Sequence, residues 1–200
     1  MNTSSTRWYR VTAALSLCLL AGASQAHTGH GTSGLWEGLA HPGGLDHLLA
    51  MVAVGLWSLS SLPASKVVWG PVTFMMSLVV GAVLGVMGVT VPFLENMISL
   101  SVVLFGIMLV LAQRKMPIAL GLGGVALAAF FHGIAHGAES PQAGFTSYVA
   151  GFLLTTSALH FGGVLAGLCI RGFVPCNAKL VLAGLGALCS GAGVYLFSQI

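Results

Sequence analysis

Long apolar segments bounded by prolines recur along the chain and decide what it can fold into. A helix needs about 20 mainly apolar residues to cross the ~30 Å hydrocarbon core of a bilayer. Charged residues make up only 6% of the 200 residues, whereas about 25% is usual for a soluble domain. We therefore expect an all-α, polytopic membrane helix bundle. The sequence predicts six transmembrane helices, at residues 44–62, 67–90, 93–112, 117–137, 146–170 and 178–198.

The first 26 residues have the pattern of a secretory signal peptide. Arg7 and Arg10 form a basic n-region, residues 11–22 form an apolar h-region, and Ala26 ends a small-residue cleavage site. The predicted organisation is thus a signal peptide over residues 1–26 and a six-helix transmembrane domain over residues 27–200. An uncleaved first helix is the alternative, and it places residue 27 on the same side of the membrane.

The basic residues after the signal segment predict the topology. Lys66, Arg114, Lys115, Arg171 and Lys179 all fall in the first, third or fifth connection between predicted spans. Connections rich in Lys and Arg stay in the cytoplasm. We expect a multi-pass protein of the bacterial inner membrane, with the mature N-terminus and the C-terminus both in the periplasm.

Acidic residues and histidines gather on the side of the predicted bundle that this topology places in the periplasm. Random scatter would have put some of them near the inner ends of the spans. Ionisable residues within a membrane span are costly and by default mark a functional site. His160 alone lies deeper, near the middle of the fifth span. The residues on the outer side are Glu37, Asp46, Glu95, Glu139, His27, His30, His41, His47, His132 and His136.

One short stretch places three of these side chains on a single helix face. In residues 131–139 (FHGIAHGAE), His132, His136 and Glu139 fall within about 60° of one another around the helix axis. Two imidazoles and a carboxylate arranged in this way offer three ligands to one metal ion.

The first predicted span is preceded by a second stretch, residues 41–47 (HPGGLDH). Asp46 and His47 are adjacent, and each is a candidate for direct contact with a metal ion. Asp46 has other roles open to it. It can cap the helix or favour the positive end of the helix dipole, or it can orient the neighbouring imidazole.

Together the two stretches predict a metal site, with further residues assisting it. Glu95 and His160 are candidate relay residues within the membrane, and His27 and His30 are candidates for capturing an ion in the periplasm. The predicted metal ligands are His41, Asp46, His47, His132, His136 and Glu139.

Residues 41–55 (HPGGLDHLLAMVAVG) and 131–139 resemble the HupE/UreJ family of nickel and cobalt permeases. The resemblance extends to the signal segment and the predicted spans, and it implies nickel uptake for metalloenzyme maturation. Glu95 matches the family's glutamate in the third span by position. Four residues separate His41 from Asp46, one fewer than in the family pattern, which turns His41 by about 100° if the stretch is helical.

The leading functional hypothesis is a permease domain that passes a divalent metal ion, with the lipid bilayer around it and no permanently bound cofactor. Imidazole and carboxylate ligands suit Ni²⁺, Co²⁺, Zn²⁺ and Cu²⁺ alike, so only the resemblance favours nickel, with cobalt second. An intramembrane metal-dependent hydrolase is the alternative, because three ligands and an open position can activate water. Haem ligation fits less well, because His132 and His136 share one helix face.

Two other kinds of partner are not expected. The formal charge of +3 includes no basic run that could follow a nucleic-acid backbone. No lysine follows a glycine, so the phosphate-binding loop of an ATPase subunit is absent from this chain. We expect a transporter and not an enzyme.

Ni²⁺ uptake should fall as the external pH drops below about 6.5, because a protonated imidazole cannot bind a metal ion. Uptake of radiolabelled Ni²⁺ between about pH 5 and 7, at a fixed proton gradient, measures this dependence. A flat profile over that range would contradict the histidine site.

Overall fold

The structure, a computed structural model, describes residues 34–41, 44–112, 114, 116–141 and 143–200. The predicted signal peptide lies outside the described residues, and so do His27 and His30. Every regular element in the described part of the chain is a helix, which confirms the all-α class. In chain order the elements are α2 (Leu35–Ala40), α3 (Leu45–Ser61), the 3₁₀ helix η3 (Ala64–Lys66), α4 (Trp69–Val86), α5 (Leu94–Val110), α6 (Ile118–Ala138), α7 (Phe145–Phe173) and α8 (Ala178–Phe197).

The expected number of six membrane spans is wrong. Among the described residues, four helical segments are long and apolar enough to cross a membrane: Ala64–Val86, α6, α7 and α8. Helices α3 and α5 are apolar but have only 17 residues each, or about 25 Å at 1.5 Å per residue. Local backbone geometry limits both. Leu62 is extended before Pro63 and ends α3, while Phe93, at a left-handed φ of 58°, directly precedes α5.

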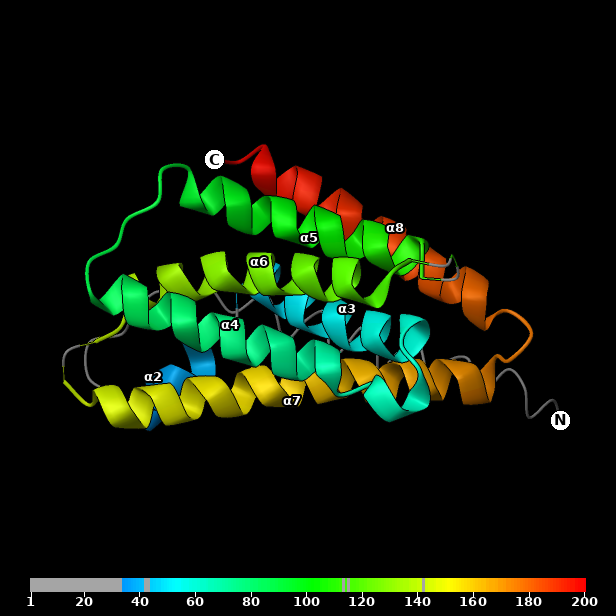
Figure 1. Cartoon of the computed structure of the whole chain (residues 1–200), viewed down its shortest axis with the longest axis horizontal. Coiled ribbons are helices and arrows are strands. Elements are labelled where there is room, and N and C mark those ends of the chain that lie inside the picture. Colours follow the sequence, from blue (N-terminus) through cyan, green and yellow to red (C-terminus); the bar gives the residue numbers. More distant parts are fainter. Residues whose placement is uncertain (1–33, 42–43, 113, 115, 142) are drawn as a thin grey trace, which may run out of the picture.

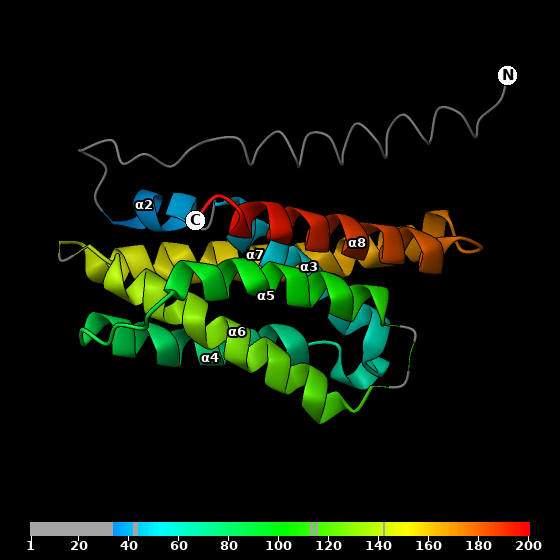
Figure 2. The same cartoon turned by 90° about the horizontal axis from the view of Figure 1, so that it is seen from above.

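The helices form one bundle in which consecutive long helices run in opposite directions (Figure 1). The starts of α3, α5 and α7 and the ends of α4, α6 and α8 lie at the same end of the bundle. Helix α4 packs along α6, α5 along α8, and α7 along both α2 and α3. Helix α3 also contacts α4, α5 and α8, and it lies among the other helices when the bundle is viewed from above (Figure 2). The shortness of α3 therefore does not expose it.

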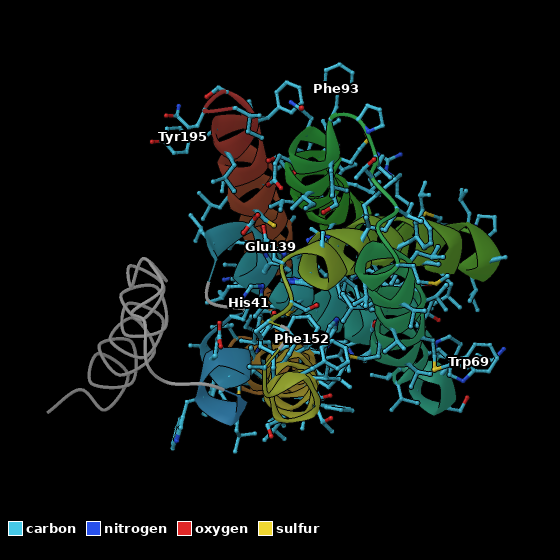
Figure 3. All side chains as sticks on the ribbon, turned by 90° about the vertical axis from the view of Figure 1, so that its left-hand side faces the viewer. His41, Trp69, Phe93, Glu139, Phe152 and Tyr195 are labelled. Atoms are coloured by element: carbon cyan, nitrogen blue, oxygen red, sulfur yellow. The ribbon has the colours of Figure 1, made fainter. Side chains whose placement is uncertain are left out.

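Acidic and basic side chains of the described chain lie at opposite ends of the bundle. Glu37, Asp46, Glu95 and Glu139 belong to the end where α3, α5 and α7 begin, which faces the viewer in Figure 3. The basic residues of the described chain belong to the opposite end: Lys66, Arg114, Arg171 and Lys179. Arg171 also has a structural role, since its Nη2 donates a hydrogen bond of 2.8 Å to the Leu59 carbonyl in the last turn of α3.

Glycines allow the backbones of α4 and α6 to touch. A Cβ on Gly81 of α4 would overlap the Phe130 carbonyl oxygen, and a Cβ on Gly133 of α6 would overlap that of Leu78. Small residues of this kind are common where membrane helices pack, because no hydrophobic effect drives them together in lipid. Gly133 lies next to His132, so this contact fixes the position of the histidine-bearing part of α6 against α4.

Gly133→Ala should destabilise the bundle by roughly 1–3 kcal/mol, because the added methyl group must push α4 and α6 apart. Gly123→Ala is the matched control on the same helix, since a Cβ at Gly123 meets nothing within 4 Å. The control should be neutral or slightly stabilising, as alanine favours a helix over glycine. Thermal unfolding of the two variants in detergent compares them, and equal midpoints would contradict the proposed backbone contact.

Candidate metal-binding site

Four histidine rings from three segments contact one another at the acidic end of the bundle. His41 is the C-cap residue directly after α2, His47 lies in the first turn of α3, and His132 and His136 lie in the last turns of α6. The His47 ring centroid is 4.8 Å from that of His132 and 4.3 Å from that of His136. The His41 ring centroid lies 4.8 Å from that of His136. The shorter spacing before Asp46 therefore does not remove His41 from the cluster.

Hydrogen bonds fix which nitrogen two of these rings present. His132 Nδ1 donates to the Ala128 carbonyl oxygen at 3.0 Å, and His47 Nδ1 donates to Asp46 Oδ1 at 2.8 Å. A carbonyl or carboxylate oxygen can only accept, so each Nδ1 carries the proton and each Nε2 keeps its lone pair. This is the arrangement that metal-binding histidines commonly adopt.

The nitrogens that remain are buried and have no hydrogen-bond partner among the described residues. They are Nε2 of His47, Nε2 of His132 and both ring nitrogens of His136. His132 is 0% exposed and His136 is 4% exposed. Buried polar atoms are nearly always paired, because leaving one unpaired costs free energy. These nitrogens belong to rings that contact one another, and each neutral ring keeps one lone pair, so the cluster is a candidate site for a group that accepts lone pairs.

Asp46 orients His47 in this structure. Its Oδ1 accepts hydrogen bonds from both the ring Nδ1 and the backbone N–H of His47, the latter at 2.9 Å. Of the roles open to Asp46 from the sequence, the contacts favour the positioning of the neighbouring imidazole. They also bring the carboxylate charge next to the cluster.

Glu139 forms the outer margin of the site. Its Oε2 lies 3.5 Å from Nε2 of His41, and ligand atoms of His41, His136 and Glu139 all lie within 4.8 Å of one another. The hydrogen bond with His41 holds the pKa of the Glu139 carboxyl below its usual value. The position of Glu139 near solvent, with 62% of its side chain exposed, suits first contact with a cation.

The two predicted relay residues lie outside this cluster. Glu95 belongs to the first turn of α5 at the same end of the bundle, and it is exposed. His160 is fully buried on α7, with Phe74 between it and the cluster. The Phe74 ring centroid lies 5.8 Å from His132 and 4.6 Å from His160.

Aromatic side chains that carried no signal in the sequence complete the walls of the site. Phe152 lies 4.4 Å from His136, and Tyr148 lies 5.3 Å from His41, ring centroid to ring centroid. Tyr148 and Phe152 stack within 7° of parallel on α7, and Figure 3 shows Phe152 near His41 and Glu139. An apolar cavity of about 340 Å³ between α4 and α7 reaches His136 and Tyr148. Tyr148 and Phe152 are four residues apart, which places them on one face of α7, but this spacing alone does not distinguish a site wall from ordinary packing.

The structure is a membrane helix bundle with a histidine-rich cluster buried at one end. Comparison with known proteins gives the family. The chain matches the family described as HupE / UreJ protein over residues 15–196. It is 40% identical over 161 residues to Protein HupE of Rhizobium leguminosarum bv. viciae, which covers 79% of this chain and 83% of that protein. No solved structure matches significantly. The chain belongs to the HupE/UreJ family, as the sequence resemblance predicted.

Asp46→Asn should weaken Ni²⁺ binding by about 10- to 100-fold. The asparagine amide has no negative charge, so it accepts the hydrogen bond from His47 Nδ1 less strongly than the carboxylate does. Equilibrium binding of Ni²⁺ to the purified protein in detergent measures the change. Glu37→Gln is the matched control, since it removes a carboxylate from the same end of the bundle. Equal affinities for both variants would show that Asp46 does not position His47 for metal binding.

Proposed function

We propose that this protein carries a divalent transition-metal ion, most simply Ni²⁺ or Co²⁺, from the periplasm across the inner membrane into the cytoplasm. One observation carries the proposal. Four imidazoles contact one another at one end of an apolar bundle, and nitrogens of His47, His132 and His136 have no hydrogen-bond partner within the described chain. Membership of the HupE/UreJ family, which is associated with nickel and cobalt transport, supports the same conclusion.

The ligand set fits the chemistry of such an ion. Imidazole nitrogens suit Ni²⁺ and Co²⁺, although binding affinity alone would favour Cu²⁺. The carboxylates of Asp46 and Glu139 partly offset the charge of the ion, which reduces the cost of moving it out of water. His41, His136 and Glu139 would receive the ion first, and His47 and His132 would hold it deeper. Glu95 would attract ions to this end of the bundle, and His27 and His30 would capture them in the periplasm.

The charge distribution supports the orientation. Lys66, Arg114, Arg171 and Lys179 lie at the end opposite the histidine cluster, and basic ends of membrane helices stay in the cytoplasm. The cluster and the C-terminus then face the periplasm, and a signal peptide over residues 1–26 would deliver the N-terminus to the same side. No observation favours the hydrolase alternative.

Removing the two imidazoles of α6 should abolish transport. Cells that express His132→Ala or His136→Ala should accumulate radiolabelled Ni²⁺ at the rate of cells without the protein, because each change deletes a buried ligand. Leu127→Ala is the matched control, since Leu127 lies on the same helix with 59% of its surface exposed. It should leave uptake unchanged.

The amount of each variant in the membrane is measured in parallel by immunoblot. Normal Ni²⁺ uptake by an inserted double variant lacking both imidazoles would end the proposal. Uptake of Co²⁺ or Zn²⁺ in competition with Ni²⁺ decides which ion the site prefers.

A further inference from the structure

Two buried polar side chains on α7 lie beyond the histidine cluster, towards the basic end of the bundle. His160 Nδ1 donates to the Thr156 carbonyl oxygen at 2.7 Å, so His160 Nε2 keeps its lone pair. His160 Nε2 and Thr156 Oγ1 have no hydrogen-bond partner in the described part of the chain, and both residues are 0% exposed. The adjacent hydroxyl differs, because Ser157 Oγ donates to the Leu153 carbonyl of its own helix at 2.7 Å.

A third unpaired polar atom lies on α3. Ser58 is 0% exposed, and its Oγ has no partner among the residues described. Ser60, two positions later, instead donates to the Leu56 carbonyl at 2.7 Å. The Ser58 hydroxyl faces Gly70 of α4, where a Cβ would overlap it. The absence of a side chain at Gly70 thus makes room for the Ser58 hydroxyl itself, which lies against the backbone of α4.

Contacts with α4 show the order in which these groups follow one another along the bundle. Gly70 and Phe74 are four residues apart and so lie one turn apart on the same face of α4. Phe74 contacts His160, and Gly70 contacts Ser58. Helix α4 starts at the basic end, so Gly70 is nearer that end than Phe74. From the cluster inwards the order is therefore His132, Phe74 with His160, and then Ser58.

Helices α3 and α7 touch along the same level. A Cβ on Gly55 of α3 would overlap the His160 carbonyl oxygen. His160 thus lies where α3, α4 and α7 meet, with Thr156 one turn before it on α7 and Ser58 further towards the basic end on α3; we call these three residues the inner polar seam.

We propose that His160 Nε2, with Thr156 Oγ1 one turn before it on α7 and Ser58 Oγ further inwards, provides a second, weaker cation position that the transported ion passes after the histidine cluster. The inference rests on the proposed function. One imidazole and two hydroxyl oxygens bind a divalent transition-metal ion less tightly than several imidazoles with carboxylates. A transport path needs this difference, because each position must bind well enough to be entered and weakly enough to be left. The cluster captures the ion, and the seam releases it towards the cytoplasm.

The test separates transport from capture. The full-length protein and its variants are purified, and Ni²⁺ binding is measured in detergent and radiolabelled Ni²⁺ uptake in liposomes. His160→Asn keeps a donor for the Thr156 carbonyl but lacks Nε2, Thr156→Val keeps the shape without the hydroxyl, and Ser58→Ala removes Oγ. Each should lower the uptake rate by roughly tenfold or more, with Ni²⁺ binding at the cluster unchanged.

The controls are Ser157→Ala and Ser60→Ala, which remove hydroxyls that bond their own helices. Both should transport at the wild-type rate. Wild-type uptake by the His160, Thr156 and Ser58 variants would overturn the inner position while leaving the proposed function intact. Equal loss of binding and uptake would also overturn it, since the three groups would then not form a separate position. Absence of uptake by the unaltered protein would instead refute the proposed function.

Discussion

Contact between helix backbones is the constraint on which the rest of this structure depends. Lipid provides no hydrophobic drive for helices to associate, so close packing must supply the attraction. Gly81 and Gly133 bring α4 and α6 into backbone contact, and Gly55 does the same for α3 and α7. These two pairs carry the histidine cluster and the inner polar seam. Side chains that are distant in sequence share one small space because no Cβ separates their helices.

The resulting bundle is electrically asymmetric along its length. Carboxylates and unpaired imidazole nitrogens lie at one end, and every basic side chain of the described elements lies at the other. Carboxylates at the first end attract cations from water, and the histidine cluster lies there. Beyond Phe74 the buried polar groups without a partner among the described residues include His160, Thr156 and Ser58. In the proposed function, such a series of groups would suit passage of an ion better than its tight storage.

Periodicity and charge predicted the helical class, the approximate positions of α3 to α8 and the end of the bundle at which the histidines gather, but not the short helix α2. They did not predict that α3 and α5 would be short, because apolar content hides where a backbone turns. The left-handed φ of Phe93 is a conformational fact that hydropathy does not encode. Nothing in the sequence shows that Ser58 lacks a hydrogen-bond partner while Ser60 has one, or that Tyr148 contacts the cluster while other aromatic residues do not. Only packing decides which hydroxyl finds a partner.

His136 differs from the rings beside it in one respect that matters for motion. His47 and His132 are each held by a hydrogen bond at Nδ1, so turning either ring breaks that bond. Neither nitrogen of His136 is held by any described residue. Its imidazole can turn over and offer the opposite nitrogen at no cost in hydrogen bonding. In the proposed function, His136 is therefore the ring whose turn would change which of its neighbours, His41 or His47, shares an ion with it.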